Sequence, residues 1–285
     1  MRLILLTALT MTAFAANSVL NRMAVGPGHI GAVDFAAIRL VAGAAMLGVL
    51  VLARRAAGRG VPSRIAPLRR LLGAASLLVY LFGFSLAYLS LDAGGGALIL
   101  FGMVQISMLA GALVIAEPVP RQRWAGAALA FGGLVWLFAP WAGSGAALSA
   151  PHVFLMAAAG VGWGVYSLSA RGAADPLGAT AGNFLVAAPV GLVVLVAGAG
   201  STADTAGVTL AVLSGAVTSG LGYALWYAIL PALGAARAAV AQLSAPVIAA
   251  FGGLILIGEP VTPRLLVAGA VVLGGVALAS LPRRR

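Results

Sequence analysis

Residues 111–119, GALVIAEPV, return 142 residues later as residues 253–261, GLILIGEPV. The same offset aligns the Gly-Gly pair at 132–133 with the pair at 274–275. A looser match, with an offset of 149, places residues 18–22, SVLNR, over residues 167–171, SLSAR. Self-similarity at a fixed spacing indicates a duplicated structural unit. We therefore predict two related halves, residues 1–140 and residues 150–285.

The composition is typical of a membrane protein. Of the 285 residues, 62% are hydrophobic and 8% are charged, whereas soluble domains carry about 25% charged residues. The mean hydropathy is +1.10. Cysteine is absent, which excludes disulfides, thiolate metal sites and a cysteine nucleophile.

Apolar segments of membrane-spanning length fill nearly the whole chain. A spanning helix needs roughly 20 mostly apolar residues. Ten such helices are predicted, at residues 3–23, 32–53, 68–91, 94–115, 122–139, 151–171, 178–199, 207–230, 236–257 and 264–281. The first resembles a signal peptide, but we keep it as a helix because residues 18–22 have a counterpart in the second half.

The arginines indicate how the helices are oriented. All 17 basic residues are arginine, and a net charge of +11 does not indicate nucleic-acid binding, because most of them lie in short loops between apolar segments. Fourteen fall on one side of the predicted topology: Arg2, Arg54, Arg55, Arg59, Arg64, Arg69, Arg70, Arg121, Arg123, Arg171, Arg237, Arg283, Arg284 and Arg285. Positive residues favour the cytoplasmic side, so both termini are predicted to be cytoplasmic.

The number of helices per half determines how the halves are related. Five is odd, so the second half enters the membrane in the opposite sense to the first. Inverted repeats of this kind pack about a pseudo-two-fold axis, with a substrate site between them near the middle of the bilayer. The predicted fold class is an all-α polytopic membrane protein of ten transmembrane helices in two inverted five-helix repeats.

Polar and aromatic residues inside apolar helices mark candidate walls of that site. On the first helix, Phe14 and Asn17 share a face, and the repeat aligns them with Trp163 and Tyr166. Polar groups at membrane depth are expected to face protein or water rather than lipid. The same reasoning selects Tyr80, Phe84, Phe101, Gln105, Tyr223, Tyr227, Gln242 and Ser244. The alternative is that these residues serve packing and interhelical hydrogen bonding alone.

Four further residues are candidates for structural or gating roles. Arg39, inside the second helix, could bind a substrate carboxylate, but we favour a structural tie to Asp34 or Asn17. Glu117 and Glu259 each end a helix before proline, where we expect them to cap the next helix; a gate at each face is the alternative. Pro246 removes a backbone hydrogen bond from its helix, which predicts a local break.

Taken together, these features resemble the EamA family of the drug/metabolite transporter superfamily. They are the five-plus-five helices, the two Glu-Pro pairs, the two Gly-Gly pairs and the arginine in the second helix. Within that superfamily, the length and small loops are similar to bacterial amino-acid exporters, the aromatic amino-acid exporter in particular. The resemblance implies a multi-pass protein of the cell inner membrane that exports small metabolites.

The nearly uncharged aromatic wall favours neutral or zwitterionic amino acids as substrates, carried by alternating access. Another small neutral metabolite or a drug, or flux through a passive channel, is the alternative. We expect no enzymatic activity, because no intramembrane aspartate pair or nucleophile motif is present. No metal and no cofactor are expected, nor any partner beyond the solute and the bilayer, in which a monomer suffices.

Overall fold

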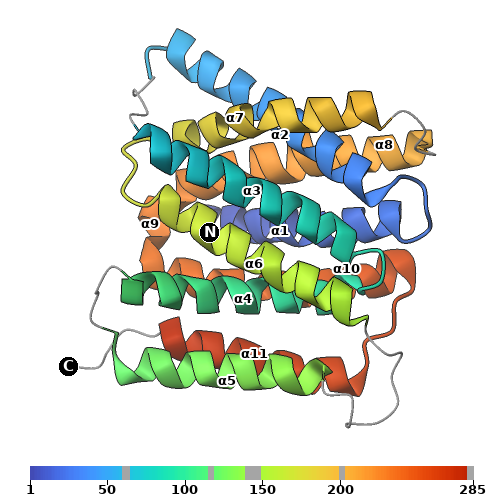
Figure 1. Cartoon of the computed structure of the whole chain (residues 1–285). Coiled ribbons are helices and arrows are strands. Elements are labelled where there is room, and N and C mark those ends of the chain that lie inside the picture. The colour runs from blue at the N-terminus through green and yellow to red at the C-terminus, as the bar shows by residue number, and fades with distance from the viewer. Residues whose placement is uncertain (60–64, 115–118, 139–148, 199–202, 281–285) are drawn as a thin grey trace.

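The computed structural model is all-helical over the residues that it describes, 1–59, 65–114, 119–138, 149–198 and 203–280. The helices are α1 (Arg2–Val25), α2 (Ala32–Ala56), α3 (Pro67–Ala87), α4 (Ala93–Val114), α5 (Arg121–Phe138), α6 (Ala150–Ser169), α7 (Pro176–Ala197), α8 (Thr205–Val212), the π-helix η2 (Leu213–Leu221), α9 (Gly222–Gln242), α10 (Ser244–Ile257) and α11 (Pro263–Ser280). Figure 1 shows them lying side by side along one common direction.

Within these described ranges, eight helical stretches are long and apolar enough to cross a membrane. They are Arg2–Val25, Ala32–Ala56, Pro67–Ala87, Ala93–Val114, Ala150–Ser169, Pro176–Ala197, Thr205–Leu233 and Val240–Ile257. A further apolar helix, Pro263–Ala279, is shorter. The chain is thus a multi-pass membrane protein, while the full count of ten spans and the side on which the termini lie stay predictions.

The outer surface of the bundle is apolar, unlike that of a soluble protein. Large apolar side chains lie on the outside, with Val196 81% and Ile255 76% exposed. Polar side chains, Asn17, Arg39 and Asn183 among them, are buried inside the bundle. In hydrocarbon, polar groups must find partners within the protein, while apolar side chains can face lipid.

Helices from the first half of the chain pack against helices from the second half throughout the bundle. α2 packs against α7, α5 packs against α11, and α6 packs against both α3 and α4. α1 contacts α10, η2 and α9. In Figure 1, the α2–α7 pair lies at one edge of the bundle and the α5–α11 pair at the other. Residues from both halves therefore surround the centre.

Contacts between helix ends show that successive helices run in alternating directions. The C-terminal ends of α1, α3 and α10 meet at Arg22, which lies beside the N-terminus of α4. At the opposite end of the bundle, the guanidinium of Arg54, near the C-terminus of α2, lies 3.1 Å from the carboxylate of Asp175, the N-cap of α7. We refer to these two ends as the Arg22 end and the Arg54 end.

The second half differs from the expected segments in one place. The gap expected at residues 231–235 is helical, because α9 continues through Pro231 into the alanine-rich stretch that ends at Gln242, and alanine is the strongest helix former. The helix instead breaks at Leu243, three residues before Pro246. Pro246 has no N–H to offer the carbonyl of Gln242, which accounts for a break at this point.

Candidate functional site

A small cavity lies inside the bundle, between helices of both halves. Its lining residues are Phe14, Asn17, Tyr80, Phe84, Leu100, Phe101, Trp163, Thr218 and Tyr223. The room that a water-sized molecule can enter between them is only about 10 Å³. Small-molecule sites usually enclose about 300–1,000 Å³. The walls must therefore move apart before a solute of amino-acid size can fit.

Trp163 is the centre of the aromatic part of the lining. Its ring stacks on Tyr80 at a centroid distance of 5.3 Å and meets Phe101 edge-on at 5.2 Å. The ring of Phe14 lies 6.2 Å from Trp163 and 5.7 Å from Tyr223. Aromatic pairs in these arrangements stabilise one another by about 0.5–1.5 kcal/mol. Together the rings form an apolar surface that a flat or aliphatic group can contact.

Asn17 supplies the polar side of the lining. Its Oδ1 accepts hydrogen bonds from the hydroxyls of Ser214 at 2.8 Å, Thr218 at 2.7 Å and Ser219 at 3.3 Å. These three donors all belong to the π-helix η2. A π-helix bonds from i to i+5, so its turn is wider than that of an α-helix. The wider turn lets Thr218 and Ser219, four and five positions after Ser214, reach the same Asn17 Oδ1.

Arg39 lies behind the polar side of the cavity and is 1% exposed. Its Nη2 donates to the hydroxyl of Tyr80 at 2.8 Å, and its Nε donates to Ser219 Oγ at 3.2 Å. The predicted direct tie to Asp34 or Asn17 is absent from the described residues, because Ser219 lies between the guanidinium and Asn17. A structural role remains, since Arg39 links α2 to α3 and η2.

Two of the predicted wall residues, Tyr166 and Tyr227, lie next to the cavity but do not line it. Tyr166 and Tyr227 both hydrogen-bond to the hydroxyl of Thr180, each at 2.9 Å. Tyr166 is one helical turn further toward the Arg54 end than Trp163. These three residues close the Arg54 side of the cavity and are not among its lining residues.

The remaining predicted wall residues do not line the cavity. Gln105 lies one turn beyond Phe101 on α4 and is half-buried. Gln242 is also half-buried at the end of α9, and the hydroxyl of Ser244 donates to the carbonyl of Ala241. Pro246 is buried in α10. Gln242 and Ser244 fall outside the cavity because α9 runs on to Gln242, which carries both residues toward the Arg54 end.

Sequence reasoning missed Leu100 and Thr218, and it did not single out Ser214 and Ser219 as partners of Asn17. Leu100 carries no signal, because it is one leucine in an apolar helix. The hydroxyl-rich stretch LSGAVTSGL at 213–221 was the available signal. Its significance depends on the π-helical turn, which no spacing rule indicates in advance.

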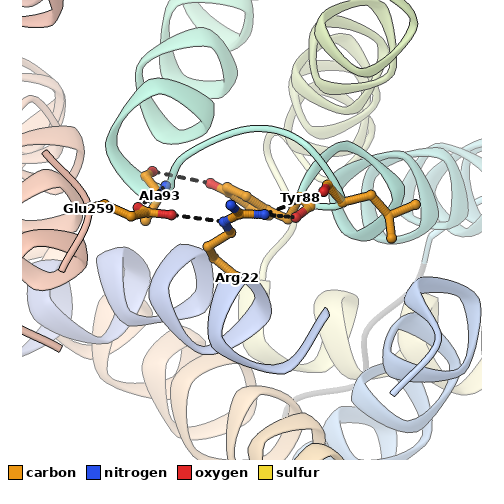
Figure 2. A network of polar contacts seen from close by, with 5 residues as sticks. Arg22, Tyr88, Ala93 and Glu259 are labelled. Carbon is orange, nitrogen blue, oxygen red and sulfur yellow. Dashed lines mark hydrogen bonds and ion pairs between the residues drawn. The ribbon is translucent and has the colours of Figure 1, made fainter. Parts of the chain in front are cut away.

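A polar network connects four helices at the Arg22 end. The Nε of Arg22 donates to Glu259 Oε1 at 2.8 Å, and its Nη1 donates to the carbonyls of Tyr88 at 3.0 Å and Leu89 at 3.4 Å. The second oxygen of Glu259 accepts from the backbone N–H of Ala93 at 2.8 Å. Figure 2 shows Arg22 between Glu259 and the end of α3.

The role of Glu259 thus differs in part from the prediction. It does cap a helix, but the helix is α4 rather than α11, the next one along the chain. A carboxylate at a helix N-terminus is stabilised by the free N–H groups and the helix dipole. Glu117, its counterpart in the repeat, lies outside the described residues.

Asp92 adds a second carboxyl group beside this network. Burial raises the pKa of Asp92 above its ordinary value, the charge of Glu259 raises it further, and Arg22 opposes both. Glu259 already occupies the N-terminus of α4. A negative charge on Asp92 is therefore poorly compensated.

The groups around the cavity are suited to binding a small solute. Its lining offers aromatic faces, one amide, hydroxyls and a nearby guanidinium. Among the described residues, no cluster of three or more His, Asp or Glu side chains could hold a metal ion. Such a lining can bind a small solute that has an apolar part and a polar part.

Comparison with known proteins identifies relatives over the whole length. Residues 150–281 match the family model described as the EamA-like transporter family. An uncharacterized protein of Pseudomonas aeruginosa is 47% identical over 286 residues, covering 99% of this chain and 96% of the relative. A solved crystal structure superposes with a TM-score of 0.65 at 22% identity, covering 95% of this chain and 98% of the other. At that identity, the structural likeness concerns the fold.

Proposed function

Because the chain belongs to the EamA-like transporter family, we propose that it exports small amphipathic metabolites across the inner membrane, in particular aromatic and other neutral amino acids. The family places the chain among multi-pass membrane transporters of small molecules. The observation that supports the substrate class is the cavity, whose aromatic rings surround Trp163 and whose polar side is Asn17.

The proposed mechanism is alternating access, with the cavity as the binding site. The Arg22 network on one side and the Tyr166–Thr180–Tyr227 contacts on the other close the two ends in turn. Phe14 lies eight residues from Arg22, or about 12 Å along α1, which puts the cavity well inside the bundle. A site near the middle of the membrane, reached from one side at a time, is what inverted-repeat transporters use.

The packing supports the proposed ten-helix inverted repeat. If the halves are related by a pseudo-two-fold axis, helices that flank the axis pack against their own symmetry mates, as α2 does with α7 and α5 with α11. In addition, the α4–α6 contact has its counterpart in α10–α1. In this proposal both termini, like the Arg54 end, are cytoplasmic.

Uptake by purified protein in proteoliposomes tests this function. A panel of radiolabelled amino acids, nucleosides and sugars is offered at several concentrations, with empty liposomes as the control. We expect saturable uptake of one or more neutral amino acids and none above the control for sugars. If no panel compound enters faster than into empty liposomes, the proposed function is wrong.

A further inference from the structure

Arg39 is a buried cation that forms no ion pair with any carboxylate among the described residues. Its side chain is 1% exposed and lies inside an apolar bundle. The three ion pairs of the described residues join Arg22 to Glu259, His29 to Asp204 and Arg54 to Asp175. A charge at membrane depth is costly unless it is paired, and such residues mark substrate pathways in membrane proteins.

The neutral partners of Arg39 accept hydrogen bonds from only some of the N–H donors of its guanidinium. Nη2 and Nε donate to the hydroxyls of Tyr80 and Ser219, but Nη1 is buried without a hydrogen-bond partner in the described part of the chain. The guanidinium carbon also lies 4.9 Å from the ring centre of Phe84 and 5.3 Å from that of Tyr80. Contacts with aromatic faces stabilise a cation but do not supply an acceptor for Nη1.

The same partners connect Arg39 directly to the cavity. Tyr80 and Phe84 both contact the guanidinium, and both line the cavity. Ser219, the third partner, also hydrogen-bonds to Asn17 on the cavity wall. The positive charge is thus separated from the solute space by the thickness of one side chain.

We propose that Arg39 binds the negatively charged group of the transported solute, and that this group is a carboxylate next to an apolar part. The inference rests on the proposed function and adds to it the requirement for an acid group. A carboxylate offers two oxygens to a guanidinium in a parallel, charge-assisted arrangement. One oxygen accepts from the unpartnered Nη1, and the other replaces the Tyr80 hydroxyl at Nη2.

The charge of the site limits which anions fit. Arg39 places one positive charge against the lining residues Tyr80 and Phe84. One positive charge matches a single carboxylate, whereas a phosphate monoester would leave part of its charge uncompensated. An amine without an acid group would bring a second positive charge next to Arg39 and be repelled.

Three compounds with the same ring test the acid requirement in exchange assays with the intact protein in proteoliposomes. They are L-phenylalanine, 3-phenylpropionate and phenethylamine. We expect the two carboxylates to exchange, and phenethylamine to compete at least about tenfold more weakly, as expected for the loss of a charge-assisted pair. Equal competition by phenethylamine overturns the inference alone, because exchange of L-phenylalanine would still support the proposed function. Exchange of nucleosides or sugars but of no acid overturns the inference together with the proposed amino-acid substrates. If no compound exchanges at all, the proposed function fails with it.

Variants of Arg39 show whether this residue causes the preference for compounds that carry a carboxylate. In Arg39→Gln, we expect the preference for L-phenylalanine over phenethylamine to fall by about 10-fold to 100-fold. Arg39→Lys keeps the charge but not the planar fork, so it should keep the preference and raise the apparent KM about tenfold. Arg55→Gln, an exposed arginine of the same helix, is the control and should match the unmodified protein.

Should Arg39→Gln fail to fold, the lysine variant and the three compounds still decide the question. A folded Arg39→Gln variant that keeps the full preference contradicts the inference. So does an Arg39→Lys variant that is folded, as judged by gel filtration, and has lost the preference.

Discussion

At the scale of single residues, the cavity depends on a few side chains that combine packing with recognition. Trp163 contacts three other rings of the lining, from α1, α3 and α4. Asn17 binds three hydroxyls of one helix. Both residues are buried by protein rather than exposed to lipid, so their substitution is expected to affect the cavity directly.

Replacing Trp163 tests the aromatic wall. In Trp163→Ala, we expect the initial rate of L-phenylalanine exchange to fall about tenfold or more, because contacts worth about 0.5–1.5 kcal/mol each are lost. Trp163→Phe keeps an aromatic ring and should retain most of the rate. Trp124→Ala is the control, since Trp124 is 51% exposed on α5. Full activity in Trp163→Ala would show that this ring takes no part in binding.

The sequence was sufficient to predict most of this wall. Seven of the nine lining residues, Phe14, Asn17, Tyr80, Phe84, Phe101, Trp163 and Tyr223, were chosen because polar or aromatic side chains in apolar helices face the interior. The structure brings them together, while their role in binding stays a prediction. Thr218 and the Arg39–Ser219 contact could not be predicted, because they depend on the turn of a π-helix.

At the scale of elements, glycine determines how closely helices approach. One glycine of each Gly-Gly pair, Gly133 and Gly275, packs between α5 and α11. A side chain at Gly275 would lie 2.6 Å from backbone atoms of Gly126 and Ala130. At Gly133 it would meet Val271 and Val272. Gly132 and Gly274 have nothing within 4 Å.

The neighbouring glycines 274 and 275 therefore form a matched pair for mutation. Gly275→Ala should lower the unfolding free energy by about 1–3 kcal/mol, because the methyl group meets backbone atoms that must move. Gly274→Ala should be neutral or add up to about 1 kcal/mol through helix propensity. Thermal unfolding in detergent measures both. Similar melting temperatures for the two variants would contradict the observed packing.

Weakening the Arg22 network is expected to increase access to the cavity from the Arg22 end. Glu259→Gln removes an ion pair worth about 1 kcal/mol, which should raise labelling of the cavity about fivefold. The chain contains no cysteine, so Leu100→Cys reports access to an impermeant thiol reagent. Asp204→Asn, which removes the exposed pair with His29 at the same end, is the control. Unchanged labelling in Glu259→Gln would argue against gating at this end.

The carboxyl group of Asp92, also at the Arg22 end, is expected to make the melting temperature depend on pH. Its pKa is raised in the folded protein, so ionisation of Asp92 disfavours the folded state. This penalty sets in as the pH rises past the ordinary pKa of an aspartate and is complete above the raised pKa. Asp92→Asn should therefore raise the melting temperature at pH 7.5. The difference from the unmodified protein should shrink as the pH falls, because the native carboxyl then becomes protonated. A difference that stays constant with pH would assign the effect to something other than this charge.

For the whole molecule, the hydropathy was enough to predict a multi-pass helical membrane protein. The repeat could not indicate that α9 continues past Pro231, because alanine-rich helices tolerate a proline at a membrane-buried position when neighbours compensate. It also could not indicate which helix Glu259 caps, since that depends on how α10 packs against α4.

Counterflow shows whether this cavity belongs to a carrier or to a channel. Proteoliposomes are loaded with unlabelled L-phenylalanine and diluted into a trace of the radiolabelled compound. We expect the label to accumulate transiently above its external concentration, with rates that saturate as the external concentration rises. Label that merely equilibrates, at a rate proportional to concentration, would indicate a channel and contradict alternating access.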